Sequence, residues 1–247
     1  MLTGGMPQFG VWSSLKDPVV LQILANSDHD FVCVDLQHGY ADTSDLPALL
    51  NTATQTQTPC LVRVAWNAPD LIMRALDLGA GGVLVPLVND GADAARAARS
   101  CRYPPDGERS WGPQWAEVRE QHEPQQANAH VRCIAMIETA QALANVSDIA
   151  ATDGVDGLYI GQNDLSISLG IGRTDFAASE LLTSAIREVI RAARANGILV
   201  GLDTAGRVSD VAFWAREGID FYIVGRDVAL INAGATDISR SLRSSLK

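Results

Sequence analysis

Eight short apolar runs recur along the chain, and each is separated from the next by a segment whose apolar positions have helical spacing. The runs cover residues 9–13, 31–36, 60–65, 82–87, 132–137, 157–161, 197–202 and 221–225. Because consecutive positions are apolar, both faces of each strand must be buried, as in a parallel sheet covered by helices. Helices are expected at 18–27, 70–80, 93–100, 147–153, 179–197 and 208–218.

The number of strand–helix units favours an α/β fold that closes into a single (β/α)8 (TIM) barrel, with an open doubly wound sheet as the alternative. The length of 247 residues and hydrophobic content of 47% fit one such barrel, so we expect one domain over residues 1–247. The long connection at 88–131 predicts an ordered loop over one end of the barrel. Residues 227–247 predict a last helix with a tail.

The charge of the chain excludes some partners. A formal net charge of −10 argues against nucleic acid, because phosphate backbones are bound by clustered Lys and Arg.

The sequence has no signal-peptide pattern and no run of about 18 apolar residues, so we expect a cytoplasmic protein with no membrane partner. Its four cysteines lack CxxC pairing, which predicts buried thiols rather than metal ligands or disulfides.

Reactive groups of a barrel belong at the C-terminal ends of its strands and in the loops that follow. Polar residues at those places are Asp35, His38, Arg63, Glu138, Gln162, Asn163 and Asp164. Glu138 and Asp164 follow neighbouring strands, so they could hold a hard divalent cation, Mg²⁺ or Mn²⁺, between them. Helix capping by the same two acids is an equally good explanation at this point.

Asp35 and His38 lie three positions apart across a strand end, where the carboxylate could orient the imidazole as a general base. A loop histidine with a local hydrogen bond is the alternative. Arg63 lies within an apolar strand, so an internal acid or a ligand's carboxylate or oxyanion must face it, and its place near the rim favours the ligand. Asp77 falls at a helix end, where a structural role is the default.

Six motifs in order resemble those of one family, the HpcH/HpaI aldolases, which are metal-dependent pyruvate-type aldolases related to the citrate lyase β-subunit. They lie at 35–42, 61–64, 75–86, 102–113, 136–139 and 160–170, and the resemblance extends over about residues 9–230. It implies a class II aldolase that reversibly cleaves a 4-hydroxy-2-oxo acid to pyruvate, or hydroxypyruvate, and an aldehyde. By position, Glu138 and Asp164 match the family's two metal ligands, for Mg²⁺ or Mn²⁺ with Co²⁺ as a further option.

The resemblance also implies catalytic roles for four residues. His38 matches the base that takes the C4-hydroxyl proton, and Asp35 matches its orienting partner. Arg63 corresponds to the residue that stabilises the enolate oxygen. Asp77 corresponds to an acid that increases the basicity of the histidine from near a subunit boundary, and the family suggests a homo-oligomer, a hexamer or a trimer. A C-terminal helix exchanged between subunits would fit the end of the chain.

Substrate contacts implied by the resemblance fall on Arg63, Met136, Gly161, Asn163, Asp164 and Leu202. Two positions depart from the family pattern, because Gln37 replaces a common Glu and Met136 replaces a common Gln. Both changes leave the identity of the substrate open.

Lysine is scarce, and its scarcity bears on mechanism. An aldolase without a metal forms a Schiff base on a pocket lysine, but the chain has only Lys16 and Lys247, which lie outside every predicted strand end. Two other functions stay open as alternatives, a CoA-thioester lyase of the citrate lyase β-subunit type and a non-catalytic barrel that binds a metal or an oxo acid.

Overall fold

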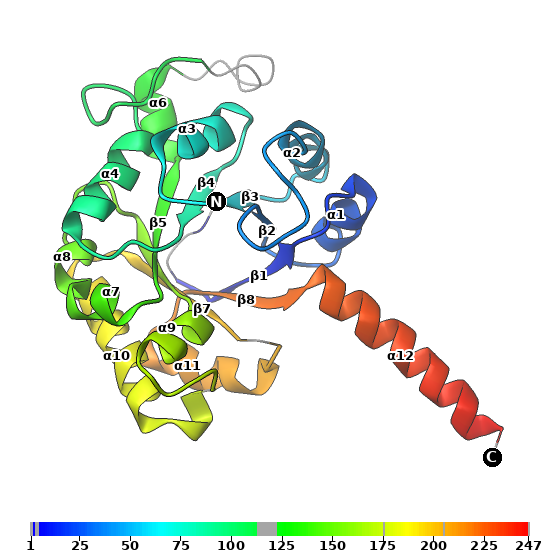
Figure 1. Ribbon diagram of the computed structural model, residues 1–247. Helices are drawn as coiled ribbons and strands as arrows, with labels where there is room; N and C mark the ends of the chain where they lie inside the picture. The colour runs from blue at the N-terminus through cyan, green and yellow to red at the C-terminus, as the bar shows by residue number, and fades with distance from the viewer. Residues whose placement is uncertain (1, 3–4, 113–122, 175, 205, 247) are drawn as a thin grey trace.

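The computed structural model describes residues 2, 5–112, 123–174, 176–204 and 206–246. Eight parallel strands close into a barrel in sequence order, with β8 paired to β1 (Figure 1). The strands are β1 (Gln8–Ser13), β2 (Phe31–Asp35), β3 (Cys60–Arg63), β4 (Gly82–Val85), β5 (Arg132–Ile137), β6 (Gly157–Ile160), β7 (Leu199–Asp203) and β8 (Phe221–Arg226). The predicted (β/α)8 barrel is confirmed, and each of the eight predicted runs overlaps a strand.

Helices surround the barrel on the outside, except for the last one, α12, which projects from it (Figure 1). They are α1 (Pro18–Ala25), α2 (Leu46–Gln55), α3 (Pro69–Asp77), α4 (Gly91–Cys101), α6 (Pro124–His130), α7 (Ala140–Ala144), α8 (Val146–Ala150), α9 (Gln162–Ser168), α10 (Glu180–Ala195), α11 (Val211–Glu217) and α12 (Asp227–Ser245), with short 3₁₀ turns η1 (Phe176–Ala178) and η2 (Val208–Asp210). The connection at 88–131 contains α4 and α6, and its residues 113–122 lie outside the described part of the chain. Within the described residues, none of the helices is both long and apolar enough for a membrane span.

The core has two layers, one inside the barrel and one between the strands and the helices. The inner layer holds large rings, and two of them need a glycine on a neighbouring strand. A Cβ on Gly10 would overlap the ring of Phe31, and a Cβ on Gly201 would overlap the ring of Phe221. All four cysteines are buried free thiols, as predicted.

The last helix, α12, leaves the barrel instead of packing beside β8, and it projects away from it (Figure 1). Its first residue, Asp227, is the one buried residue of the helix, and its carboxylate accepts the backbone N–H of Ser14 and Leu15, both at 2.7 Å. Apolar side chains along the rest of the helix are exposed, among them Ile231, Ile238 and Leu242. One chain alone therefore leaves the apolar side of α12 uncovered.

The inner layer gives a test of packing. We expect Gly201→Ala to lower the free energy of unfolding by about 1–3 kcal/mol, because the new methyl group must displace the Phe221 ring in a filled interior. Urea unfolding measures the change. Gly91→Ala is the matched control, since its Cβ would meet only ordinary contacts beginning at 3.7 Å. Equal stability of the two variants would contradict this account of the interior.

Candidate active site

Polar side chains gather at the end of the barrel where the strands finish. Asp35, Arg63 and Asp203 are the last residues of β2, β3 and β7, and Glu138 directly follows β5. Each is in phase with inward-facing residues of its strand, because alternate strand residues share a face. Asp164 lies beside them in the first turn of α9. These residues form the rim of the barrel mouth.

Asp35 and Arg63 form a buried, bidentate ion pair across β2 and β3. Arg63 Nη2 lies 2.6 Å from Asp35 Oδ2, and Nε lies 2.8 Å from Oδ1. Burial alone would raise the pKa of Asp35, but the hydrogen bonds and charge of Arg63 outweigh it, so that pKa is lowered. The anion that faces Arg63 is therefore an internal acid. Arg63 Nη1, which has no recorded hydrogen bond to the described residues, can still donate to a ligand.

The same carboxylate holds the loop that carries His38. Asp35 Oδ1 accepts the backbone N–H of Gln37 at 3.1 Å and of His38 at 3.2 Å. A Cβ on Gly39 would overlap the backbone oxygen of Asp35, so the loop can approach β2 this closely only with glycine there. Among the described contacts, Asp35 reaches His38 through its backbone and not through its imidazole, and the His38 side chain is exposed.

Glu138 is buried, with 3% of its surface exposed, and its charge is poorly compensated. Its Oε1 accepts the backbone N–H of Leu87 at 2.7 Å, and Leu87 has a left-handed φ of 54°. Burial raises the pKa of Glu138, the Leu87 hydrogen bond opposes that rise, and the charge of Asp164 adds to it. Just after neighbouring β6, a Cβ at Gly161 would lie 2.9 Å from Glu138 Oε2. The absence of a side chain at residue 161 thus makes room for this carboxylate.

Helix capping does not explain Glu138. Thr139 caps α7, because its Oγ1 accepts the backbone N–H of Ala142 at 2.9 Å. Asp164 lies in the first turn of α9, where an acid is stabilised by the helix dipole. That placement is compatible with a second role for its exposed carboxylate.

The two acids suit a divalent cation. Glu138 and Asp164 offer oxygen donors, and a cation between them would relieve both the burial of Glu138 and the repulsion between the two charges. The described residues contain no cluster of three or more His, Cys, Asp or Glu side chains that could hold a metal. Two carboxylates plus water and substrate oxygens are the ligand set that Mg²⁺ commonly uses, so the residues fit such an ion.

Asp77 lies at the other end of the barrel. It is the last residue of α3, five positions before β4 begins, and the nearby Gly81 N–H donates to the first residue of β3, Cys60. Its carboxylate pairs with Arg109, at 2.7 Å from Nη2 and 3.2 Å from Nε. Within one chain, Asp77 and the His38 loop are therefore at opposite ends of the strands.

The other residues assigned to substrate binding fall in different environments. Met136 faces the barrel interior and is buried, whereas Leu202 is buried in the outer layer that faces the helices. Asn163 is exposed in the first turn of α9, one residue before Asp164. Because Leu202 belongs to that outer layer, its side chain faces the surrounding helices and not the mouth of the barrel.

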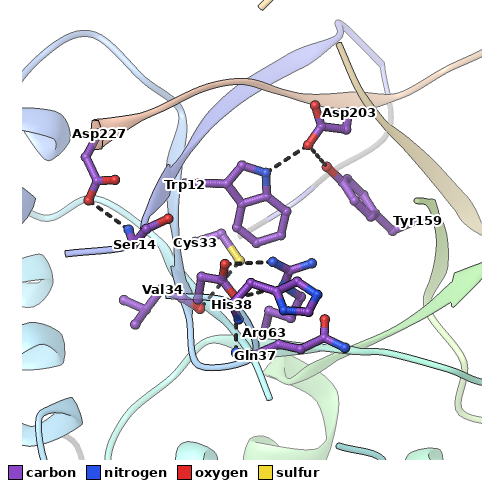
Figure 2. Close-up of polar contacts among 11 residues, drawn as sticks. Trp12, Ser14, Cys33, Val34, Gln37, His38, Arg63, Tyr159, Asp203 and Asp227 are labelled. Atoms are coloured by element: carbon purple, nitrogen blue, oxygen red, sulfur yellow. Dashed lines mark hydrogen bonds and ion pairs between the residues drawn. The ribbon is translucent and has the colours of Figure 1, made fainter. Parts of the chain in front are cut away.

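Three rim residues were not anticipated from the sequence. Trp12 Nε1 donates to Asp203 Oδ2 at 2.9 Å, and the Tyr159 hydroxyl donates to the same oxygen at 3.5 Å (Figure 2). The Arg63 guanidinium stacks on the Trp12 ring, 4.4 Å from its centroid. The one available signal was that a buried indole N–H needs an acceptor at a nearby strand end.

The raised pKa of Glu138 gives a prediction for stability without metal. A carboxyl whose pKa is raised on folding destabilises the protein as pH rises through and above the ordinary value of 4.5. We therefore expect Glu138→Gln in EDTA to increase the free energy of unfolding near pH 7 and to have little effect near pH 4. Thermal melts at both pH values measure this, and a variant less stable than the wild type at pH 7 would refute it.

Comparison with known proteins gives the family. A profile of the HpcH/HpaI aldolase/citrate lyase family matches residues 8–233. The chain is 34% identical over 241 residues to the hydroxypyruvate/pyruvate aldolase of Rhizorhabdus wittichii, covering 97% of this chain and 96% of that protein. It is 33% identical over 247 residues to the 2-dehydro-3,6-dideoxy-6-sulfogluconate aldolase of Pseudomonas putida, covering 98% and 95%. An HpcH/HpaI aldolase/citrate lyase family protein of Burkholderia cenocepacia has a similar solved structure, with a TM-score of 0.88, 29% identity, and 96% and 95% of the chains covered. As its motifs predicted, the chain belongs to the HpcH/HpaI aldolase/citrate lyase family.

Proposed function

We propose that this protein is a divalent-metal-dependent aldolase, a carbon–carbon lyase that reversibly cleaves a 4-hydroxy-2-oxo acid to pyruvate or hydroxypyruvate and an aldehyde. One observation carries the proposal. The carboxylate oxygens of Glu138 and Asp164 lie on the same rim of the barrel as the guanidinium of Arg63. The first relative named above acts, by its name, on the same small oxo acids.

Cleavage of the C3–C4 bond leaves negative charge on the oxygen of the oxo acid, and that oxygen needs an electrophile already in place. A bound Mg²⁺ or Mn²⁺ would supply Lewis-acid stabilisation there, with Glu138 and Asp164 as its protein ligands. Arg63 adds a second positive group on the same side of the mouth, held in position by Asp35. An imine mechanism would need a lysine in the pocket. Lys16 is exposed in the turn after β1, where its charge acts on Asp42, and this placement favours the metal route over an imine.

His38 is the candidate base for the C4-hydroxyl proton. Its imidazole is exposed at the mouth, while its backbone is tied to Asp35. Asp77 could increase the basicity of His38 only from a second copy of the chain, because the two lie at opposite ends of one barrel. We therefore propose that the active enzyme is a homo-oligomer in which Asp77 approaches a neighbour's mouth.

The projecting helix α12 supports assembly through exchange between copies. A complete barrel has its eighth helix between α11 and α1, and both of those helices expose apolar side chains, Phe213 on α11 and Val19 on α1. The exposed Ile231, Ile238 and Leu242 of α12 offer the matching apolar surface. A second copy's α12 in this position would cover both surfaces.

Chelation tests the proposed function. We expect EDTA to abolish the release of pyruvate from a 4-hydroxy-2-oxo acid and Mg²⁺ or Mn²⁺ to restore it, because without the ion Glu138 and Asp164 carry only negative charge and cannot stabilise the oxygen of the oxo acid. Glu138→Ala should lower kcat/KM by at least about a hundredfold at saturating metal. A panel of such acids, coupled to pyruvate detection, measures both effects. Activity that survives both EDTA and Glu138→Ala would refute the metal-dependent aldolase.

The exchange of α12 has its own test. Leu242→Glu should reduce the particle mass in light scattering, because a charge would be buried in the contact between copies. Ser244→Glu adds the same charge on the opposite side of the helix and should leave the mass unchanged. If both variants, or neither, change the mass, this arrangement of α12 is wrong.

A further inference from the structure

The mouth of the barrel has two unlike sides. Glu138 and Asp164 occupy the side formed by β5 and α9, and a separate group of residues occupies the side where β7 and β1 end. We call Trp12, Ser14 and Asp203 the far wall. Nothing in the reaction as described above uses Asp203, although it places a third inward-facing carboxylate at the mouth.

Asp203 is held firmly in this position. Its Oδ2 accepts the Trp12 indole N–H at 2.9 Å and the Tyr159 hydroxyl at 3.5 Å (Figure 2). Its backbone oxygen accepts a hydrogen bond from Gln162 Nε2 at 2.6 Å. The Arg63 guanidinium stacks on the face of the Trp12 ring. One aromatic ring therefore separates Asp203 from the group that would stabilise the reacting oxygen. A substrate tail that extends past Arg63 in this direction reaches Asp203.

Unpartnered oxygen atoms add to the polarity of the mouth. Ser14 Oγ, Gln37 Oε1 and Gln162 Oε1 are buried and have no hydrogen-bond partner among the described residues, and they lie just beyond β1, β2 and β6. A buried polar atom without a partner is costly unless a ligand or water satisfies it. The two amide oxygens can only accept hydrogen bonds, so the group that satisfies them must donate one.

The charges at this end do not suit an anionic tail. Four carboxylates, those of Asp35, Glu138, Asp164 and Asp203, lie at the mouth. Among the described cations at this end, Arg63 is paired with Asp35, and the exposed Lys16 in the turn after β1 acts on Asp42. Two more arginines lie near the C-terminal ends of β7 and β8. Arg207, after β7, is paired with Asp210. Arg226, the last residue of β8, follows the inward-facing Gly225, so its side chain points outward.

We propose that Asp203 is a specificity-determining residue that selects a neutral, hydroxyl-bearing aldehyde over an aldehyde with a second carboxylate. This inference rests on the proposed function and extends it to the aldehyde. The Asp203 carboxylate accepts hydrogen bonds from aldehyde hydroxyl groups and repels a second carboxylate. A hydrogen bond to a charged group commonly changes specificity by tenfold or more.

The test compares three aldehydes in condensation with pyruvate at saturating Mg²⁺: glyceraldehyde, propanal and succinic semialdehyde. The wild type should prefer glyceraldehyde by about tenfold or more in kcat/KM over each of the others. Asp203→Asn keeps an acceptor for Trp12 but loses the charge, and it should improve succinic semialdehyde relative to glyceraldehyde by about tenfold. Asp70→Asn, an exposed acid in the first turn of α3, is the charge-matched control and should leave the ratios unchanged.

If Asp203→Asn fails to fold, the kcat/KM values of the wild type for the three aldehydes still test the inference. Equal or better use of succinic semialdehyde by the wild type would overturn the inference, as would unchanged ratios in a folded Asp203→Asn. Metal-dependent exchange of the pyruvate methyl protons with deuterium, followed by NMR without any aldehyde, separates the two levels. Exchange with no aldehyde preference contradicts only the role of Asp203, whereas absence of exchange contradicts the proposed function and this inference together.

Discussion

The rest of the mouth depends on the ion pair between Asp35 and Arg63. A guanidinium buried among apolar strands is tolerable only with a partner, and removing one member of such a pair commonly costs about 3–5 kcal/mol. The pair does more than balance charge, because Asp35 also binds the backbone of the His38 loop and Arg63 also stacks on Trp12. One carboxylate thus sets the positions of a candidate base, a candidate electrophile and an aromatic wall.

The electrostatic environment of Glu138 is the opposite of that of Asp35. Asp35 has a full counter-charge and a lowered pKa, whereas Glu138 has one backbone donor, a nearby acid and a raised pKa. The two carboxylates have similar burial but different compensation. A site that leaves one acid only partly compensated at a fixed place is well suited to attract a cation there, and perturbed acids of this kind concentrate at functional sites.

The barrel could be predicted from sequence because parallel strands buried on both faces appear as unbroken apolar runs. Glu138, Asp35 and Arg63 could be placed at the mouth for the same reason, since each ends or follows such a run. The Asp35–Arg63 pairing could not, because it depends on which residues of β2 and β3 lie in register. The sequence does not single out Asp203, because the seventh apolar run ends at residue 202 whereas β7 continues one residue further.

Gly161 shows how closely the site depends on a missing side chain. The space that its Cβ would need is occupied by the Glu138 carboxylate on the neighbouring strand. The identity of residue 161 is therefore physically tied to that of residue 138, although the two are far apart in sequence. A larger residue at 161 fits only if the group at 138 moves or becomes smaller, so neither position can be redesigned without the other.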